Sequence, residues 1–186
     1  MPEPAAREPI KHFLDPHEVI KQLDIEEGMV IADFGAGTGY KTFAAAKLVG
    51  TGKGMVYALD VKKSVIEHLK GEIQRQNITN VKPVWTDLEM LGKNSVPPHS
   101  ADLVLIVNML YQSVKHHNVL EEARRILKPG GRLVIIDWIM QNTPFGPPID
   151  ERVNLEKIKQ IAYDLEFNKI KEFQAGHCHF GVIFRK

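Results

Sequence analysis

Apolar runs of strand length alternate along the chain with segments whose apolar residues recur at helical spacing. Five runs predict strands in the first three quarters of the chain: 29–34, 55–60, 81–85, 101–107 and 132–137. The first, fourth and fifth runs are nearly continuous in apolar residues. Such runs are typical of strands buried on both faces, as in a parallel sheet covered by helices.

Helical spacing occurs between these strands, over 42–48, 64–76 and 118–127. Ser64 is a candidate N-cap of the second helix. An earlier helix is predicted where Asp15 is suited to the N-cap, Pro16 to the first helical position and Glu18 to a capping box. The alternation of strands and helices predicts right-handed βαβ units and a doubly wound sheet.

The last third of the chain changes character. Residues 142–148 hold three prolines and a glycine and predict a loop. Asn154 is expected to cap a helix of about three turns. Two strands then follow, over 169–173 and 178–184, and their short connection predicts an antiparallel hairpin. The expected fold is therefore α/β, with a seven-stranded sheet that is mostly parallel and has one antiparallel C-terminal strand.

Composition narrows the function classes. With 186 residues, 44% hydrophobic and 25% charged, the chain has the make-up of one globular domain. Its 24 basic and 23 acidic residues give a net charge of +1, which provides no general attraction to nucleic acid or anionic lipid. One cysteine, Cys178, excludes an internal disulfide and a cysteine-rich zinc site.

The sequence pattern predicts neither a signal peptide nor a membrane-spanning segment. The first 13 residues lack the apolar core of a signal peptide. The longest apolar run, around 103–110, is far shorter than the roughly 20 residues that cross a bilayer. We therefore expect a soluble, cytoplasmic protein. We expect residues 1–14 to form an N-terminal arm or lid, and 15–186 to form a single domain.

A glycine-rich segment, Asp33-Phe34-Gly35-Ala36-Gly37-Thr38-Gly39-Tyr40, directly follows the first predicted strand. The dinucleotide fingerprint GxGxxG, counted from Gly35, requires a third glycine at the position of Tyr40. Asp33 would repel a pyrophosphate but would favour a cationic ligand. The spacing thus disfavours a nicotinamide oxidoreductase, and a tight turn without a ligand is the structural alternative.

The motif Asp-x-Gly-x-Gly-x-Gly after the first strand resembles motif I of the class I S-adenosylmethionine (SAM)-dependent methyltransferases. The resemblance extends from about Phe13 to the C-terminus, and the chain is most similar to the small methyltransferases related to quinone-biosynthesis C-methyltransferases. Around Gly37–Tyr40 it also resembles the protein isoaspartyl methyltransferases. Further landmarks stand at the family's intervals: Asp60 at the end of strand two, Asp87-Leu88 after strand three, Asn108 after strand four and Leu127–Gly131 before strand five.

This resemblance implies a Rossmann-like fold, SAM as cofactor and S-adenosylhomocysteine as product. It implies that Asp60 accepts hydrogen bonds from both ribose hydroxyls and that Asp87 meets the adenine amino group. Asp33 would offset the SAM ammonium, directly or through water. The expected cofactor-binding residues are Asp33, Gly35, Ala36, Gly37, Tyr40, Asp60, Val61, Asp87, Leu88 and Asn108. The structural alternatives are a helix cap for Asp60, a turn for Asp87 and a strand-end cap for Asn108.

The sequence names no catalytic base. Methyl transfer from a sulfonium is an in-line displacement, which chiefly requires positioning and exclusion of water. A base is required only when the nucleophile carries a proton. Asn108-Met109-Leu110-Tyr111 resembles the Asn-Pro-Pro-Tyr motif of amino and amide methyltransferases but lacks both prolines. Tyr111 is expected either to line the pocket or to fill the core.

The histidines do not predict a metal site. His116 and His117 stand at a helix entry, where we expect them to be solvated. His177 and His179 alternate along a predicted strand and would share one face. No carboxylate or third ligand accompanies them, so no metal is expected.

Acceptor choice is expected to depend on two segments, residues 10–14, with His12 and Phe13, and the loop 138–152. Trp138, Met140 and Phe145 of this loop would favour an apolar or aromatic acceptor. The leading function is therefore SAM-dependent methylation of a small molecule. Methylation of protein or RNA and a non-catalytic SAM-binding partner subunit remain as alternatives.

Overall fold

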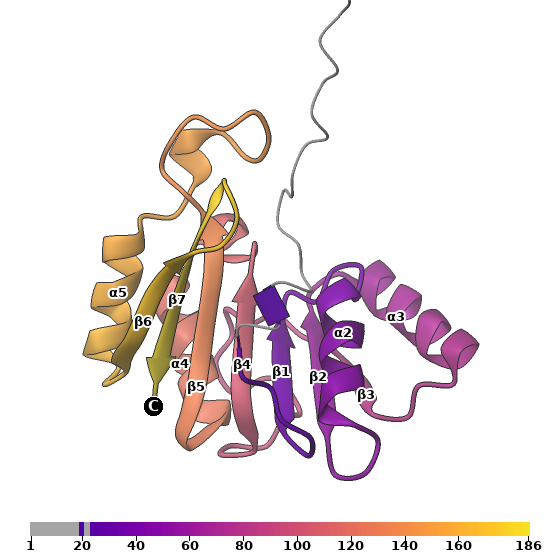
Figure 1. Cartoon of the computed structure of the whole chain (residues 1–186). Helices are drawn as coiled ribbons and strands as arrows, with labels where there is room; N and C mark the ends of the chain where they lie inside the picture. Colours follow the sequence, from indigo (N-terminus) through magenta and orange to yellow (C-terminus); the bar gives the residue numbers. More distant parts are fainter. Residues whose placement is uncertain (1–18, 21–22) are drawn as a thin grey trace, which may run out of the picture.

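The computed structural model describes residues 19, 20 and 23–186. Its seven-stranded sheet has the order β3-β2-β1-β4-β5-β7-β6 (Figure 1). The strands are β1 Val30–Phe34, β2 Met55–Asp60, β3 Val81–Trp85, β4 Ala101–Val107, β5 Leu127–Trp138, β6 Asn168–Gln174 and β7 His179–Arg185. β7 runs antiparallel to β5 and β6, and the other paired strands are parallel. The α/β prediction of a mostly parallel seven-stranded sheet with one reversed C-terminal strand is confirmed.

Helices cover both faces of the sheet (Figure 1). They are α2 Tyr40–Val49, α3 Lys63–Gln76, α4 His116–Ile126 and α5 Leu155–Asp164, with short 3-10 turns η1 Leu110–Gln112 and η2 Ile149–Glu151. Successive β4 side chains enter opposite cores: Leu103 and Leu105 pack with residues of α2 and α3, whereas Val104 and Ile106 pack with residues of α4 and α5. Burial on both faces explains the continuous apolar run of this strand.

The predicted helix caps have different outcomes. The N-cap prediction for Ser64 is wrong, because α3 begins at Lys63 and its N-cap residue is Lys62. Asn154 does cap α5, since its side chain accepts hydrogen bonds from the amides of Glu156 and Lys157. The helix predicted to begin at Asp15 and the arm 1–14 lie outside the described residues, although Val19 and Ile20 are helical and buried.

β5 begins five residues earlier than predicted. Leu127 pairs with Ala101, and regular pairing with β4 resumes at Arg132 after a register shift. In between, Gly130 donates to the carbonyl of Lys186, and the Lys186 amide donates to Gly131. The glycines therefore form a structured extension of the strand that precedes its apolar run.

One edge of the sheet is formed by β6. The edge strand β6 is exposed along most of its length and includes Lys169 and Lys171. Lysines on an edge strand oppose pairing with other chains. Within residues 19, 20 and 23–186, no helix has the length and apolarity needed to span a membrane.

A buried carboxylate fixes the connection between β3 and β4. Glu122 of α4 is fully buried and accepts hydrogen bonds from the Gly92 amide at 2.9 Å, from the Asn94 side chain and from Arg125. Burial raises the pKa of Glu122, but the hydrogen bonds from Arg125 and Gly92 outweigh it and hold the pKa below its ordinary value. The connection is therefore tied to α4 by an ionised side chain.

We predict that Glu122→Gln lowers the free energy of unfolding at pH 7 by about 1–3 kcal/mol, because an amide NH2 would face hydrogen-bond donors. The folded-state pKa lies below 4.5, so this stabilisation is present above that pH and is lost on acidification. Urea unfolding at pH 7 and pH 4 should show that the difference in free energy of unfolding between the wild type and Glu122→Gln is smaller at pH 4.

The matched control is Glu121→Gln, whose exposed carboxylate lies 3.7 Å from His117. Its effect should remain within about 0.5 kcal/mol. Equal stability of the two variants at pH 7 would contradict the assignment. So would a difference in free energy of unfolding between the wild type and Glu122→Gln that is no smaller at pH 4 than at pH 7.

Candidate functional site

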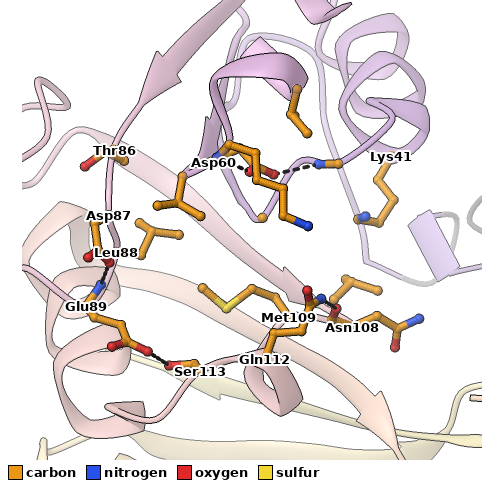
Figure 2. A pocket seen from close by; sticks show the side chains of 16 residues that line it. Lys41, Asp60, Thr86, Asp87, Leu88, Glu89, Asn108, Met109, Gln112 and Ser113 are labelled. Carbon is orange, nitrogen blue, oxygen red and sulfur yellow. Dashed lines mark hydrogen bonds between the residues drawn. The ribbon is translucent and has the colours of Figure 1, made fainter. Parts of the chain in front are cut away.

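A pocket of about 360 Å³ lies at the carboxyl ends of β1, β2, β3 and β4 (Figure 2). The strand order reverses between β1 and β4, and the helices that follow these two strands cover opposite faces of the sheet. Ligands of doubly wound folds bind at this topological switch point, because the diverging connections leave a crevice there. Seven expected residues line the pocket: Gly35, Gly37, Asp60, Val61, Asp87, Leu88 and Asn108.

The glycine-rich turn forms one wall and is shaped by its neighbours. Gly35 has a φ of 71°, and a Cβ built there would lie 2.7 Å from Cγ of Met109. Gly39, at φ 81°, precedes α2, and its Cβ would collide with Leu69 and Phe43. The turn therefore requires glycine both for its backbone conformation and for its close packing. The Gly35 and Ala36 amides donate to the carbonyl of Leu59, which ties the turn to β2.

Asp60, the last residue of β2, connects two segments of the pocket. One carboxylate oxygen accepts a hydrogen bond from the Gly37 amide at 3.1 Å, and the other accepts from the Lys62 amide at 2.9 Å. The residue is 8% exposed. Each carboxylate oxygen has further acceptor capacity, so two oxygens remain able to bind a ligand on the pocket side. Figure 2 shows both bonds.

The segment after β3 forms the opposite wall. Asp87 accepts a hydrogen bond from the Glu89 amide at 2.9 Å, and Leu88 is buried. Glu89 reaches across to the start of α4, where it accepts from the Ser113 hydroxyl at 2.7 Å and the Val114 amide at 2.8 Å. The hydrogen bond from Ser113 is the main cause that holds the pKa of Glu89 below its ordinary value. An ionised glutamate thus links two walls (Figure 2).

The end of β4 supplies the floor between these walls. Asn108 has a φ of 53°, and its amide donates to the carbonyl of Ile136 at 2.9 Å. A left-handed asparagine turns the chain abruptly into η1, so that Met109 and Gln112 also line the pocket. The buried Oδ1 of Asn108 has no hydrogen-bond partner within the described part of the chain.

Three expected residues are near the pocket but do not line it. Asp33 is fully buried, and its Oδ2 accepts a hydrogen bond from the Thr42 hydroxyl at 2.6 Å. Its Oδ1 has no partner among the residues that the structure describes. The side chain of Ala36 is buried, whereas that of Tyr40 is 54% exposed.

The sequence reasoning missed several lining residues, including Lys41, Lys62, Thr86, Glu89 and Met109. Lys41 directly follows Tyr40 in the first turn of α2, which begins at the end of the glycine-rich turn, and it lines the pocket (Figure 2). A helix that begins at a glycine-rich turn brings its first residues to the crevice, so position alone could have identified Lys41.

Two side-chain expectations near the site need correction. His116 is half-buried rather than solvated, because its Nε2 lies 2.9 Å from the carbonyl of Leu110. His177 is exposed and precedes β7, whereas His179 is fully buried in that strand, so the two do not share a strand face. Burial lowers the pKa of His179 to about 4.

Tyr111 packs against the core beneath α4 and α5 and is not among the pocket residues. Burial raises its pKa, and the nearby carboxylates of Asp137 and Glu151 raise it further. Among the described residues, no group of three or more His, Cys, Asp and Glu side chains is arranged to bind a metal ion.

The loop that follows β5 is organised around Arg152. This buried guanidinium donates to the carbonyls of Ile139, Gln141 and Pro147 at 2.6–2.9 Å. It also lies over the ring of Trp138, 5.4 Å from the ring centroid. These contacts fix the loop at the same carboxyl edge as the pocket.

The apolar side chains of this loop differ in their exposure to solvent. Trp138 is buried and stacks on His179 at a centroid distance of 4.2 Å. Met140 and Phe145 are 47% and 46% exposed. Of the three loop side chains expected to favour an apolar acceptor, only Met140 and Phe145 therefore present apolar surface to a binding partner.

Comparison with known proteins identifies relatives of the whole domain. A family model described as a methyltransferase domain matches residues 25–177. The ubiquinone/menaquinone biosynthesis C-methyltransferase UbiE of Hydrogenovibrio crunogenus is 32% identical over 134 residues, which are 72% of this chain and 51% of that protein. A demethylmenaquinone methyltransferase of Geobacillus sp. (strain WCH70) is 27% identical over 127 residues, 68% of this chain and 53% of that protein. The chain thus spans about half the length of these curated relatives.

A solved structure covers nearly the full length of both molecules. A SAM-dependent methyltransferase from Aquifex aeolicus superposes with a TM-score of 0.84 and 27% sequence identity, over 92% of this chain and 89% of that one.

We predict that Gly35→Ala is less stable than Gly37→Ala. Both positions have positive φ, at 71° and 54°, so both variants incur a left-handed penalty of about 1–2 kcal/mol. A Cβ at Gly37 meets no atom within 4 Å, whereas one at Gly35 collides with Met109. Thermal unfolding of both variants measures the difference, and equal melting temperatures would contradict the close packing of Gly35 on Met109.

Proposed function

We propose that this chain, which belongs to the methyltransferase-domain family, transfers a methyl group from SAM to a small-molecule acceptor. The observation that carries the proposal is the pocket at the switch point, where the glycine-rich turn and Asp60 face the segments after β3 and β4. The likeness to the Aquifex aeolicus enzyme, which spans both chains almost completely, supports SAM as the ligand.

The chemistry of the lining residues fits the parts of SAM. Asp60 holds two backbone amides and retains acceptor capacity for both hydroxyls of a ribose. Asp87 is exposed at the pocket, where its carboxylate suits an adenine amino group, while Val61 and Leu88 provide apolar contact for the ring. We assign the adenosine end of the cofactor to these four residues.

The opposite end of the cofactor carries an ammonium and a carboxylate. The orphan Oδ1 of Asp33, beneath the glycine-rich turn, suits an ammonium that it reaches through water. Lys41 lines the pocket from the first turn of α2 and suits a carboxylate. The glycines between them, Gly35 and Gly37, allow the backbone to approach a ligand without side-chain obstruction.

Catalysis then depends first on position. An acceptor whose nucleophilic atom carries a proton must also release that proton, and no residue of this chain is assigned as the base. The sulfonium supplies an electrophilic methyl carbon. The residues of this chain hold the cofactor at one end of the line of attack, and the segment Asn108–Gln112 bounds the space that the acceptor must enter. Asn108 lines the same space, so we keep it among the proposed cofactor-binding residues.

An apolar or aromatic acceptor agrees best with the surroundings of the pocket. The loop after β5 is fixed by Arg152 and exposes Met140 and Phe145. The two curated relatives described above are named for ubiquinone, menaquinone or demethylmenaquinone, which supports the reduced, quinol form of such a ring as the acceptor class, because the nucleophile must be electron-rich. Methylation of protein or RNA and a non-catalytic SAM-binding role are the alternatives if the chain binds SAM but turns over no small molecule.

The first test is calorimetric titration with S-adenosylhomocysteine. We expect micromolar binding by the wild type and a loss of at least about tenfold in Asp60→Asn, because the introduced NH2 would face the amide of Gly37 or Lys62 and a ribose hydroxyl would lose an anionic partner. Asp102→Asn is the matched control. Asp102 accepts the Val30 amide at 2.8 Å and pairs with Lys128, but it lies at the start of β4, at the other end of the sheet.

Two outcomes would contradict the cofactor assignment. One is a folded wild type that binds neither SAM nor S-adenosylhomocysteine. The other is an equal loss of affinity in Asp102→Asn, since that residue has no access to the pocket. Binding without turnover on any small molecule would instead support the non-catalytic alternative.

The second test concerns the acceptor. With an active quinol-type substrate, Phe145→Ala should raise the acceptor KM by about three- to tenfold through lost apolar contact, and it should leave S-adenosylhomocysteine affinity unchanged. Ile170→Ala, which removes an exposed apolar side chain from β6, serves as the control. A KM that does not change in Phe145→Ala would exclude this side chain from the acceptor site.

A further inference from the structure

A buried carboxylate at the end of β5 contacts the floor of the pocket from behind. Asp137 is fully buried, and its Oδ2 accepts a hydrogen bond from the Leu110 amide at 3.0 Å. Its Oδ1 accepts from the Trp138 amide at 2.9 Å. The amides of Met109 and Tyr111 also face the carboxylate and favour its charged form. The carboxylate thus accepts hydrogen bonds from two segments, η1 and the end of β5.

The Leu110 amide belongs to the segment that shapes the pocket. Met109 and Gln112 line it on either side of Leu110. Met109 also abuts the glycine-rich turn, because a Cβ at Gly35 would lie only 2.7 Å from its Cγ. A shift of the Leu110 backbone would therefore move Met109 relative to Gly35 and change the width of the pocket between β1 and β4.

We infer that Asp137 is a positioning residue for the cofactor pocket: its carboxylate fixes the segment 109–112 and, through Met109, sets the distance from this segment to the glycine-rich turn. The inference rests on the proposed function, since it concerns the same pocket. Asp137 does not line the pocket, so it acts through Met109 and not by touching a ligand.

The pH of the solution can change the charge of Asp137. Burial raises the pKa of Asp137 to about 6, although the four amides oppose the shift. Tyr111 of η1 interacts electrostatically with Asp137 and with Glu151 of η2. Three further titratable or charged groups lie against the neighbouring residues: His116 beside the Leu110 carbonyl, and His179 and Arg152 against Trp138. A protonated Asp137 would direct an O–H toward amide donors and would hold the segment less firmly.

Acidification has opposite consequences for folding and for the pocket. Because the folded-state pKa lies above the ordinary value of 3.8, protonation of Asp137 between about pH 6 and 4 favours the folded state. The hydrogen bonds to the segment 109–112 weaken over the same range. A merely structural role would predict changes of stability alone, whereas the positioning role predicts a loss of affinity without unfolding.

The experiment measures S-adenosylhomocysteine affinity at pH 7.5 and 5.5 for the wild type, Asp137→Asn and the control Asp102→Asn. We expect the wild type to weaken several-fold at pH 5.5. Asp137→Asn should bind about tenfold more weakly than the wild type at pH 7.5, because an amide accepts less strongly than a carboxylate, and it should change little with pH. Asp102→Asn should follow the wild type at both pH values.

A ligand-free measurement keeps the inference testable if Asp137→Asn does not fold or the wild type does not bind. In the wild type, the NMR signals of the Met109, Leu110 and Tyr111 amides should titrate together with a midpoint near pH 6. Absence of binding by the wild type would contradict the proposed function alone. Amide signals that do not move with pH, or wild-type affinity in a folded Asp137→Asn, would overturn the positioning role.

Discussion

The pocket depends on the reversal of strand order between β1 and β4. β2 and β3 extend the sheet on one side of β1, and β4 and β5 extend it on the other. The connections from β1 and β4 must therefore leave toward opposite faces, which opens a crevice that no side chain of the core fills. The residues that bound this crevice are drawn from the ends of four strands, so their relative position is a property of the whole sheet.

Carboxylates connect the otherwise separate walls of this crevice. Asp60 joins the glycine-rich turn to the start of α3, Glu89 joins the segment after β3 to the start of α4, and Asp137 joins β5 to the segment after β4. In each case the donors are mainly backbone amides, whose positions are fixed by the chain itself. A methyl transfer that relies on alignment requires such fixed walls more than it requires a titrating catalyst.

The sequence predicted the features that arise from local patterns. The apolar runs located the seven strands, and the spacing of Gly35, Gly37 and Gly39 located the pocket turn. Contacts between distant segments were not accessible in this way. From the sequence, Asp137 is indistinguishable from the other residues of an apolar strand. Only the structure shows that its carboxylate accepts a hydrogen bond from Leu110 of η1, in the segment that forms the pocket floor.

The residue type alone misplaced one helix cap and one histidine. Ser64 has the residue type of an N-cap, yet the N-cap of α3 is Lys62, two residues earlier, and Ser64 is exposed. His116 has a sequence context typical of solvent, but the carbonyl of Leu110 lies beside it in the fold. Local propensity is a weak guide wherever a tertiary partner is present.

The most direct test of the account is a crystal structure of the protein with S-adenosylhomocysteine. The account predicts that the ligand occupies the pocket at the ends of β1–β4, with its ribose hydroxyls on the carboxylate of Asp60 and its adenine beside Asp87 and Leu88. Its amino-acid end should lie between the glycine-rich turn and Lys41. Ligand bound elsewhere, or a ribose that makes no contact with Asp60, would contradict the central claim.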